Sequence, residues 1–158
     1  MGMIWPLIVF VMFLGLNAVT AYRSKQLSQP VQQSAAIANG QNFIRYRDAL
    51  TNFATANPGF TGVVPISNLL PFLYGWNAVA FSNMSNVISS LPSGGRQVAS
   101  YQTNGRGAAS ALAQSGYDAS IGRTDSAGNW SSYANPFSTS PIPTTVKNCG
   151  LVSILTTN

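Results

Sequence analysis

The feature that most restricts the fold of this chain is its first segment, residues 1–22 (MGMIWPLIVFVMFLGLNAVTAY), which contains no charged side chain. As a helix this segment would reach about 33 Å at 1.5 Å per residue, which is enough to cross the hydrocarbon core of a bilayer. Trp5 and Tyr22 lie near its ends, where amphipathic rings favour the membrane interface, and Arg23 and Lys25 follow as a polar stop. The segment therefore predicts a transmembrane anchor.

Two other interpretations of this segment stay open. A cleaved secretory signal is one, because Val19, Thr20 and Ala21 supply small residues for cleavage, although no base precedes the apolar run. A type IV pilin leader is the other, because Gly2 stands directly before an apolar helix. Pilin-like processing sites typically carry a Glu near the start of the mature helix, and this chain has no Glu, which argues against a standard pilin subunit.

The composition bears on the side of the membrane that the domain occupies. Only 7% of the residues are charged, against a usual value of about 25%, and uncharged polar residues are abundant in the C-terminal part. This surface chemistry is typical of exported proteins. The positive-inside rule, applied to Arg23 and Lys25, would instead leave the domain in the cytoplasm, but two charges are weak evidence. We expect a single-pass protein of a bacterial inner membrane with its C-terminal domain in the periplasm.

The inventory of reactive groups argues against catalysis. The chain has no His and no Glu, and its only acids are Asp48, Asp118 and Asp125. A Ser or Cys nucleophile would lack an imidazole base, and a zinc site would have a single soft ligand. Asp118 and Asp125 could in principle form a glycosidase pair, but both lie in Gly/Ser-rich sequence, where Asp commonly bonds backbone amides in turns. We expect no enzyme, no metal and no cofactor.

The single cysteine and the scattered bases exclude further classes of protein. Cys149 cannot form an intrachain disulfide; in the apolar run CGLVSIL we expect a buried small hydrophobe, with an interchain bridge as the alternative. The net charge of +5 comes from eight scattered bases without a basic run. Nucleic-acid binding usually requires a dense basic stripe, so we expect none. Attraction to anionic lipids or acidic partners stays open.

After the anchor we expect a juxtamembrane stalk over residues 23–33 and one folded domain over residues 34–158. A helix that stops at Asn57-Pro58-Gly59 is predicted by small and apolar residues at helical spacing. These residues are Ile37, Gly40, Phe43, Ile44, Leu50, Phe53 and Ala54.

Arg45, Arg47 and Asp48 fall largely on the other face of this helix. The spacing predicts an Arg45–Asp48 pair on a solvated face, and a docking face for a partner is the alternative.

Prolines and glycines break residues 58–81 into short apolar runs, which favours extended loops and edge strands over helix. Turn signals farther on separate candidate strands, and the Ala-rich residues 107–114 are a candidate short helix. The order of helix first, then strands, predicts an α+β fold, with an N-terminal transmembrane helix and then an amphipathic helix packed on a small antiparallel sheet. The candidate strands are residues 96–102, 119–124, 129–133 and 146–155.

The aromatic residues cluster in two parts of the sequence, near residue 76 and near residue 133. Aromatic residues in a small domain are usually core, but Trp and Tyr are also favoured anchors at partner surfaces. The candidate partner contacts are Arg45, Arg47, Trp76, Trp130, Tyr133 and Phe137.

Three parts of the chain carry a family resemblance: the uncharged N-terminal segment, the helix end FATANPGFTGVVP, and the late segment IGRTDSAGNWSSYANPFSTSPIPTTVKNCGLVSI. Together they resemble the PilM family of type IVb (thin) pilus systems, which conjugative plasmids and some enteric pathogens carry. The resemblance implies an inner-membrane protein that serves pilin transport or the pilus basal body through contacts with other pilus or secretion-apparatus proteins. It supplies no catalytic residues. A pilin-like minor subunit or adhesin is the alternative, and a homo-oligomer stays open.

Overall fold

The structure, a computed structural model, describes residues 32–114, 120–135, 139–142 and 146–157. The chain divides into two compact units, Met1–Ala35 and Ala36–Asn158, and nearly all described residues belong to the second. The predicted anchor lies outside the described residues, as does the predicted stalk apart from residues 32 and 33, which are helical. Within the described ranges, no helix has both the length and the apolar character needed to cross a membrane.

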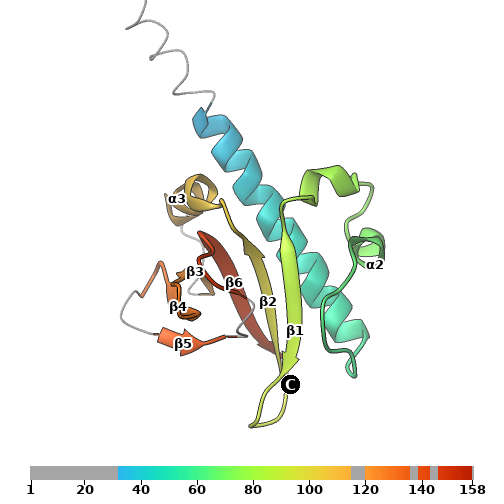
Figure 1. Ribbon diagram of the computed structural model, residues 1–158. Coiled ribbons are helices and arrows are strands. Elements are labelled where there is room, and N and C mark those ends of the chain that lie inside the picture. The colour runs from blue at the N-terminus through green and yellow to red at the C-terminus, as the bar shows by residue number, and fades with distance from the viewer. Residues whose placement is uncertain (1–31, 115–119, 136–138, 143–145, 158) are drawn as a thin grey trace, which may run out of the picture. The chain divides into compact units, whose positions relative to one another are not determined.

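The predicted α+β fold is confirmed for the second unit. A long helix, described over residues 32–56, precedes an antiparallel sheet with the strand order β1-β2-β6-β3-β4-β5 (Figure 1). The last strand, β6, pairs with both β2 and β3 and so joins the two halves of the sheet. The strands are β1 (Ser85–Ser90), β2 (Arg96–Gln102), β3 (Ile121–Thr124), β4 (Asn129–Ser132), β5 (Thr139–Pro141) and β6 (Leu151–Thr157).

The strand predictions are confirmed for the middle of the chain and incomplete elsewhere. β2, β3 and β4 fall within the predicted ranges, and α3 (Arg106–Gln114) matches the predicted short helix. β6 begins five residues after the predicted start at residue 146. Two strands were not predicted, β1 and β5. β1 has the polar sequence SNVISS, and it becomes a strand because all six of its residues pair with β2.

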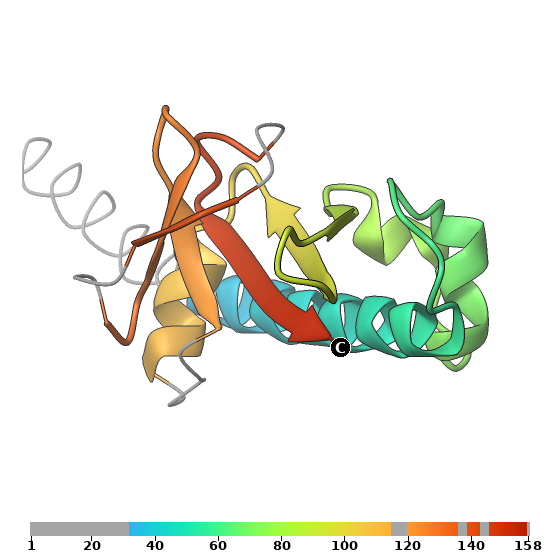
Figure 2. The same cartoon turned by 90° about the horizontal axis from the view of Figure 1, so that it is seen from below.

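The long helix lies along one face of the sheet (Figure 2). It ends at residue 56, as predicted, and both the backbone N–H and the side-chain amide of Asn57 donate to the Phe53 carbonyl. The predicted apolar stripe is buried from Gly40 onward, except that Ile44 is only partly buried. The prediction is wrong for Ile37, which is 43% exposed, because the buried part of the helix begins one turn later. At Gly40 the helix passes close to Leu112 of α3.

The two faces of the sheet carry separate hydrophobic clusters. The larger cluster lies between the sheet and the long helix and includes Phe43, Leu50 and Leu151. The smaller one includes Val152 and Cys149. The thiol is buried, as predicted, and burial raises its pKa. An interchain disulfide is therefore disfavoured in this fold.

The prediction of extended loops and edge strands for residues 58–81 is wrong for residues 66–72 and 78–81, which are helical. These residues form α2 (Ile66–Leu69) and two 3₁₀ helices, η1 (Leu70–Phe72) and η2 (Ala78–Phe81). Pro65 and Pro71 stand at helix starts, where the missing N–H leaves no bond unmade. Ring contacts with Phe53 of the long helix, from Phe60 at 5.3 Å and from Phe72 at 6.3 Å between centroids, hold the segment in place. Only Gly62 forms a bridge at the edge of the sheet, with Ile88.

Asn86 of β1 joins the edge of the sheet to two other elements. Its side chain is buried, its Oδ1 accepts from the Val64 N–H at 2.8 Å, and its Nδ2 donates to the Val64 carbonyl at 2.9 Å. The same amide nitrogen donates to the Tyr46 hydroxyl of the long helix at 2.6 Å. Burial raises the pKa of Tyr46, and the hydrogen bond from Asn86 offsets only part of that rise. One side chain thus satisfies three buried polar groups.

We expect Asn86→Leu to lower the free energy of unfolding by about 3 kcal/mol, because each buried group left without its partner costs about 1–3 kcal/mol. Denaturant unfolding of the variant and the parent measures this loss. Asn52→Leu is the matched control, because Asn52 is exposed on the long helix, and its effect should stay within about 0.5 kcal/mol. Equal stabilities for the two variants would contradict the role given to Asn86.

Candidate functional site

Two of the predicted partner contacts, Arg45 and Trp76, meet on the outside of the long helix. The Arg45 Cζ lies 4.1 Å from the centroid of the Trp76 ring. Trp76 is 41% exposed, and its inner edge contacts Phe81 at 6.3 Å between centroids. Phe81 is buried and stacks on Tyr46 of the long helix. The indole therefore rests on the core on one side and on a guanidinium on another, an arrangement worth about 0.5–1 kcal/mol at an exposed site.

Two further exposed side chains lie close to Trp76 in the sequence, and sequence reasoning did not select them. Tyr74 is 86% exposed and Val79 is 73% exposed. We call Arg45, Tyr74, Trp76 and Val79 the aromatic patch. The segment that carries it is rich in Pro and Gly, which signals turns, but no local pattern distinguishes an exposed ring from a buried one.

The backbone at Tyr74 is strained. Its φ is 41°, in the left-handed region that bulky residues rarely adopt, and Gly75 follows with a φ of 80°. Such a conformation costs on the order of 1–3 kcal/mol and persists only where the surroundings hold it. Here the buried side chain of Leu73 and the hydrogen bond from the Trp76 N–H to the Leu73 carbonyl hold it. The ring of Tyr74 is exposed to solvent, and residues strained in this way cluster at functional sites.

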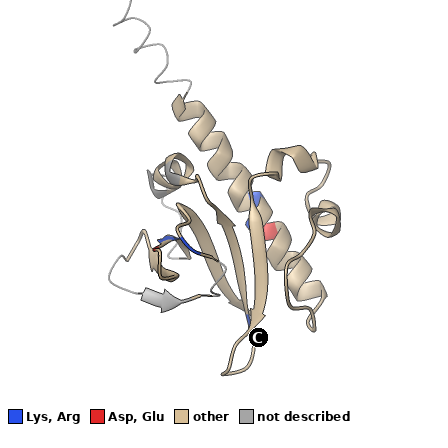
Figure 3. Ribbon diagram, viewed as in Figure 1, with Lys and Arg blue, Asp and Glu red and all other residues tan. Residues whose placement is uncertain are grey.

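The aromatic patch carries one charge. Residues 49–95 contain no charged residue, and Figure 3 shows charge confined to a few positions of the described chain. The predicted pair of Arg45 with Asp48 is wrong, because Asp48 pairs with Arg47 at 2.9 Å instead. Among the described residues, no carboxylate pairs with Arg45. Within the described ranges, the patch is therefore a largely apolar surface with one cation that no carboxylate pairs.

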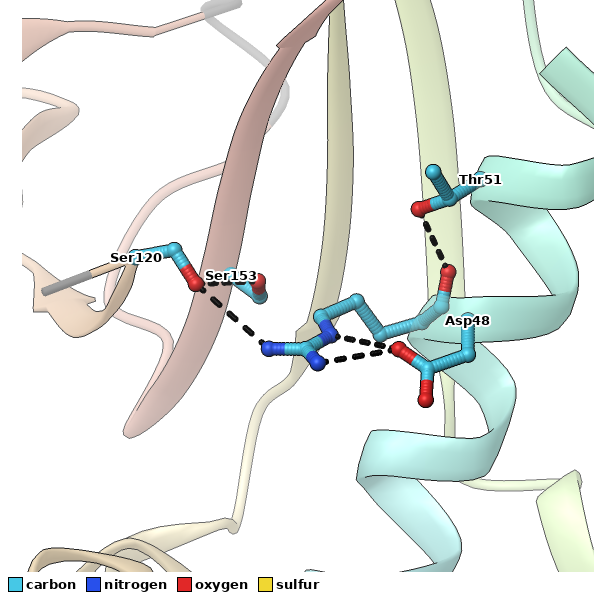
Figure 4. A network of polar contacts seen from close by, with 5 residues as sticks. Asp48, Thr51, Ser120 and Ser153 are labelled. Atoms are coloured by element: carbon cyan, nitrogen blue, oxygen red, sulfur yellow. Dashed lines mark hydrogen bonds and ion pairs between the residues drawn. The ribbon is translucent and has the colours of Figure 1, made fainter. Parts of the chain in front are cut away.

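Arg47, the second predicted contact on the helix, links the helix to the sheet. Its Nε and Nη2 both lie 2.9 Å from Asp48 Oδ1, and its Nη1 donates to Ser120 Oγ at 3.5 Å. Ser120 Oγ in turn lies 3.5 Å from Ser153 Oγ of β6, and Thr51 donates to the Arg47 carbonyl (Figure 4). The side chain of Arg47 is only 13% exposed. It serves the packing of helix on sheet more than an open surface.

Trp130 and Tyr133, two further predicted contacts, do not join the patch. Trp130 is 8% exposed and belongs to the smaller hydrophobic cluster, which favours the core interpretation of this ring. Tyr133 is 38% exposed, and its hydroxyl donates to the Gly150 carbonyl at 2.6 Å. Phe137 lies outside the described residues.

Asp125 has the predicted turn role. Its Oδ1 accepts from the backbone N–H groups of Ala127 and Asn129, at 2.9 and 2.8 Å, and its Oδ2 accepts from the Asn129 side chain. Asp118, its proposed glycosidase partner, lies outside the described residues. In the part of the chain that is described, no three His, Cys, Asp or Glu residues group as a metal site would require.

The bonds from Asn129, above all that from its side chain, lower the pKa of the Asp125 carboxyl below its ordinary value. Because the folded-state pKa is the lower one, the ionised carboxyl stabilises the turn above the unfolded value, and this contribution is lost as the pH falls through the folded value. We expect a carboxyl carbon titration by NMR to give a midpoint in the folded protein below that of an aspartate in the unfolded chain. We also expect Asp125→Asn to be less stable than the parent at pH 7 and equally stable once the carboxyl is protonated. A midpoint at or above the unfolded value would contradict the bonded turn.

The comparisons with known proteins agree with the family resemblance of the sequence. A family model described as PilM matches residues 9–154, which include the long helix, the aromatic patch and nearly all of the sheet. A crystal structure from Escherichia coli B7A, of a protein provisionally named PilM, has a TM-score of 0.55 and 22% sequence identity. The match covers 78% of this chain and 94% of that chain, and at this identity it shows a likeness of fold.

No curated protein sequence matches the chain at a significant level. The family match does not depend on a curated relative, because the family model covers most of the chain. The model also has the family name that the sequence motifs suggested. Membership of this family supports a role in pilus biogenesis. The chain belongs to the PilM family.

Proposed function

We propose that the protein is a non-enzymatic assembly component of a type IVb pilus, in pilin transport or in the basal body. Residues 1–22 anchor it in the inner membrane, and the domain acts in the periplasm through contacts with other proteins of the pilus or secretion apparatus. The observation that carries the proposal is the aromatic patch, an exposed and rigidly supported surface on a member of the PilM family.

The residue types of the patch support a protein-binding role. Trp, Tyr and Arg are the residues most enriched among those that dominate binding energy at protein interfaces. The ring of Trp76 already rests on Phe81 and Arg45, so binding would cost little side-chain entropy there. The chain has no His and no Glu, which supports a role without acid–base chemistry.

Deletion of the gene in a host that makes the pilus tests the function. We expect pilus assembly and pilus-dependent transfer to be lost, and the full chain supplied in trans to restore both. A deletion strain that still assembles functional pili would overturn the proposal.

Protease treatment of spheroplasts, with fractionation of the same cells, tests the location. We expect digestion of the domain from outside, with the intact chain in the inner-membrane fraction before treatment. Protection of the domain would place it in the cytoplasm and contradict the periplasmic part of the proposal.

A pilin-like minor subunit or adhesin is a second candidate, which one observation favours. A long helix whose buried stripe packs on an antiparallel sheet is also how pilins are built. Detection of the chain in sheared, purified filaments, with a processed N-terminus at Met3, would favour this candidate over the assembly component. Its absence from such filaments would leave the assembly role.

A further inference from the structure

We infer that the aromatic patch binds an acidic, apolar segment of a partner protein, in which an Asp or Glu carboxylate is flanked by hydrophobic side chains. The inference rests on the proposed function in one respect, namely that the partner is another protein of the pilus apparatus. It adds the chemistry of the segment that the patch recognises.

The charge of the patch selects the carboxylate. Arg45 has no carboxylate partner among the described residues, and the nearest acid on the same helix, Asp48, is bonded to Arg47. A guanidinium stacked on an aromatic ring contacts the ring with its flat face. Its N–H groups lie at the edges and stay available to donate hydrogen bonds. Two parallel N–H···O bonds to one carboxylate are the strongest use of those edges. Desolvation against Trp76 would strengthen them further.

The remaining surface of the patch selects the apolar neighbours of that carboxylate. Tyr74, Trp76 and Val79 expose rings and an aliphatic side chain within six consecutive positions. No charged residue in residues 49–95 competes with an apolar ligand there. The strained turn at Tyr74 is held from the core side through Leu73, so the ring is presented before a partner arrives. A preorganised anchor of this kind raises affinity because less freedom is lost on binding.

A second copy of this chain fits the patch poorly. The chain has a net charge of +5, so two copies repel. Among the described residues its acids are Asp48, which is paired with Arg47, and Asp125, whose two oxygens accept bonds from the β3–β4 turn. Neither offers a free carboxylate to Arg45.

An anionic lipid surface is also less well matched. Binding of basic surfaces to anionic membranes gains about 1 kcal/mol per Lys or Arg near the headgroups, so it usually needs several bases. The patch has Arg45 alone, and residues 49–95, which carry the rest of the patch, contain no charged residue. A protein carboxylate in a desolvated contact makes fuller use of a single guanidinium.

Site-specific photo-crosslinking of the full chain in pilus-producing cells tests the inference. A benzophenone amino acid replaces Tyr74, and the crosslinked segment is identified by mass spectrometry. We expect a segment of another pilus-apparatus protein with an Asp or Glu within a few residues of the crosslink. A crosslink to a second copy, to lipid or to a segment without an acid would overturn the inference, and so would the absence of any specific crosslink.

Charge reversal then tests the carboxylate itself. We expect Arg45→Glu to reduce the crosslink yield at least about tenfold, which corresponds to about 1.4 kcal/mol. Arg45→Lys should give an intermediate yield, because an ammonium cannot form the bidentate pair. Exchange of the partner's acid for Arg should restore the yield with Arg45→Glu.

Arg123→Glu is the matched control, because Arg123 is exposed on β3, and its yield should stay at the parent level. Equal yields for Arg45→Glu and Arg123→Glu, with both chains present at normal amounts, would overturn the inference. The gene deletion tests the proposed function and is interpreted separately from the crosslinking. Pili lost on deletion but normal crosslinking with Arg45→Glu would refute the acidic ligand and leave the proposed function standing. Pili retained on deletion would refute the function, whatever the patch binds.

Discussion

Gly122→Ala should lower the free energy of unfolding by about 3 kcal/mol or prevent folding altogether. A Cβ at this position of β3 would overlap the Ser131 carbonyl oxygen and would lie 2.7 Å from Trp130 Nε1. Overpacking typically costs about 1–3 kcal/mol. The upper end applies here because the obstacle is backbone, which cannot move without opening the pairing of Gly122 with Ser132.

The consequence extends beyond one residue because β3 lies between β6 and β4 in the sheet. Separation of β3 from β4 would also expose the smaller hydrophobic cluster around Trp130. Denaturant unfolding measures the loss of stability, and amide hydrogen exchange locates it in β3 and β4. Gly59→Ala is the control, because a Cβ there would meet nothing within 4 Å. If both variants unfold at the same denaturant concentration, the inferred close approach of Gly122 to the Ser131 backbone is contradicted.

Arg96→Met should lower the free energy of unfolding by about 3 kcal/mol. Arg96 opens β2 and is buried, and its Nη2 and Nη1 donate to the carbonyls of Ala54 and Asn57 at 2.8 and 2.9 Å. The last carbonyls of a helix have no N–H partner within the helix. At Ala54 the usual donor four residues on is Pro58, which has no N–H. Hydrogen bonds from a charged donor contribute about 1.5–3 kcal/mol each, and Met would provide neither bond.

Thermal and denaturant unfolding measure this effect, and two variants control it. Arg96→Lys should lose less than Arg96→Met, because it keeps the charge but not the two fixed donors. Arg123→Met removes an exposed base and should stay within about 0.5 kcal/mol of the parent. A loss of that small size for Arg96→Met would contradict the link between helix end and sheet.

The parts of the fold that could be predicted are those that depend on interactions between residues close together in the sequence. The helix stop at Asn57-Pro58 follows from a missing N–H, and the turn at Asp125 follows from a carboxylate that reaches amides two and four residues on. The strand at residues 96–102 was found from the turn signals that precede and follow it. The polar sequence of β1 gave no such signal, because its strand conformation comes from pairing with β2.

The candidate site was predictable in part for the same reason. The sequence indicated that Arg45 lies on the outer face of a helix, and it gave Trp76 as a candidate partner contact beside the core interpretation of the aromatic residues. It did not show that Arg45 contacts Trp76 instead of Asp48, because that choice depends on how the segment after Pro58 returns along the helix. Tyr74 was missed because its exposure depends on the burial of Leu73 beside it.

The amino-acid sequence by itself determined the class of this protein. It contains an apolar N-terminal segment, no His and no Glu, a helix-then-strands order, and the motifs of the PilM family. Only the tertiary structure decided which polar groups are buried together and which aromatic rings face solvent. Asn86 meets Tyr46 and Arg96 meets Ala54 across 40 and 42 positions of chain. Contacts at such separations depend on how the whole chain packs, and no local pattern encodes them.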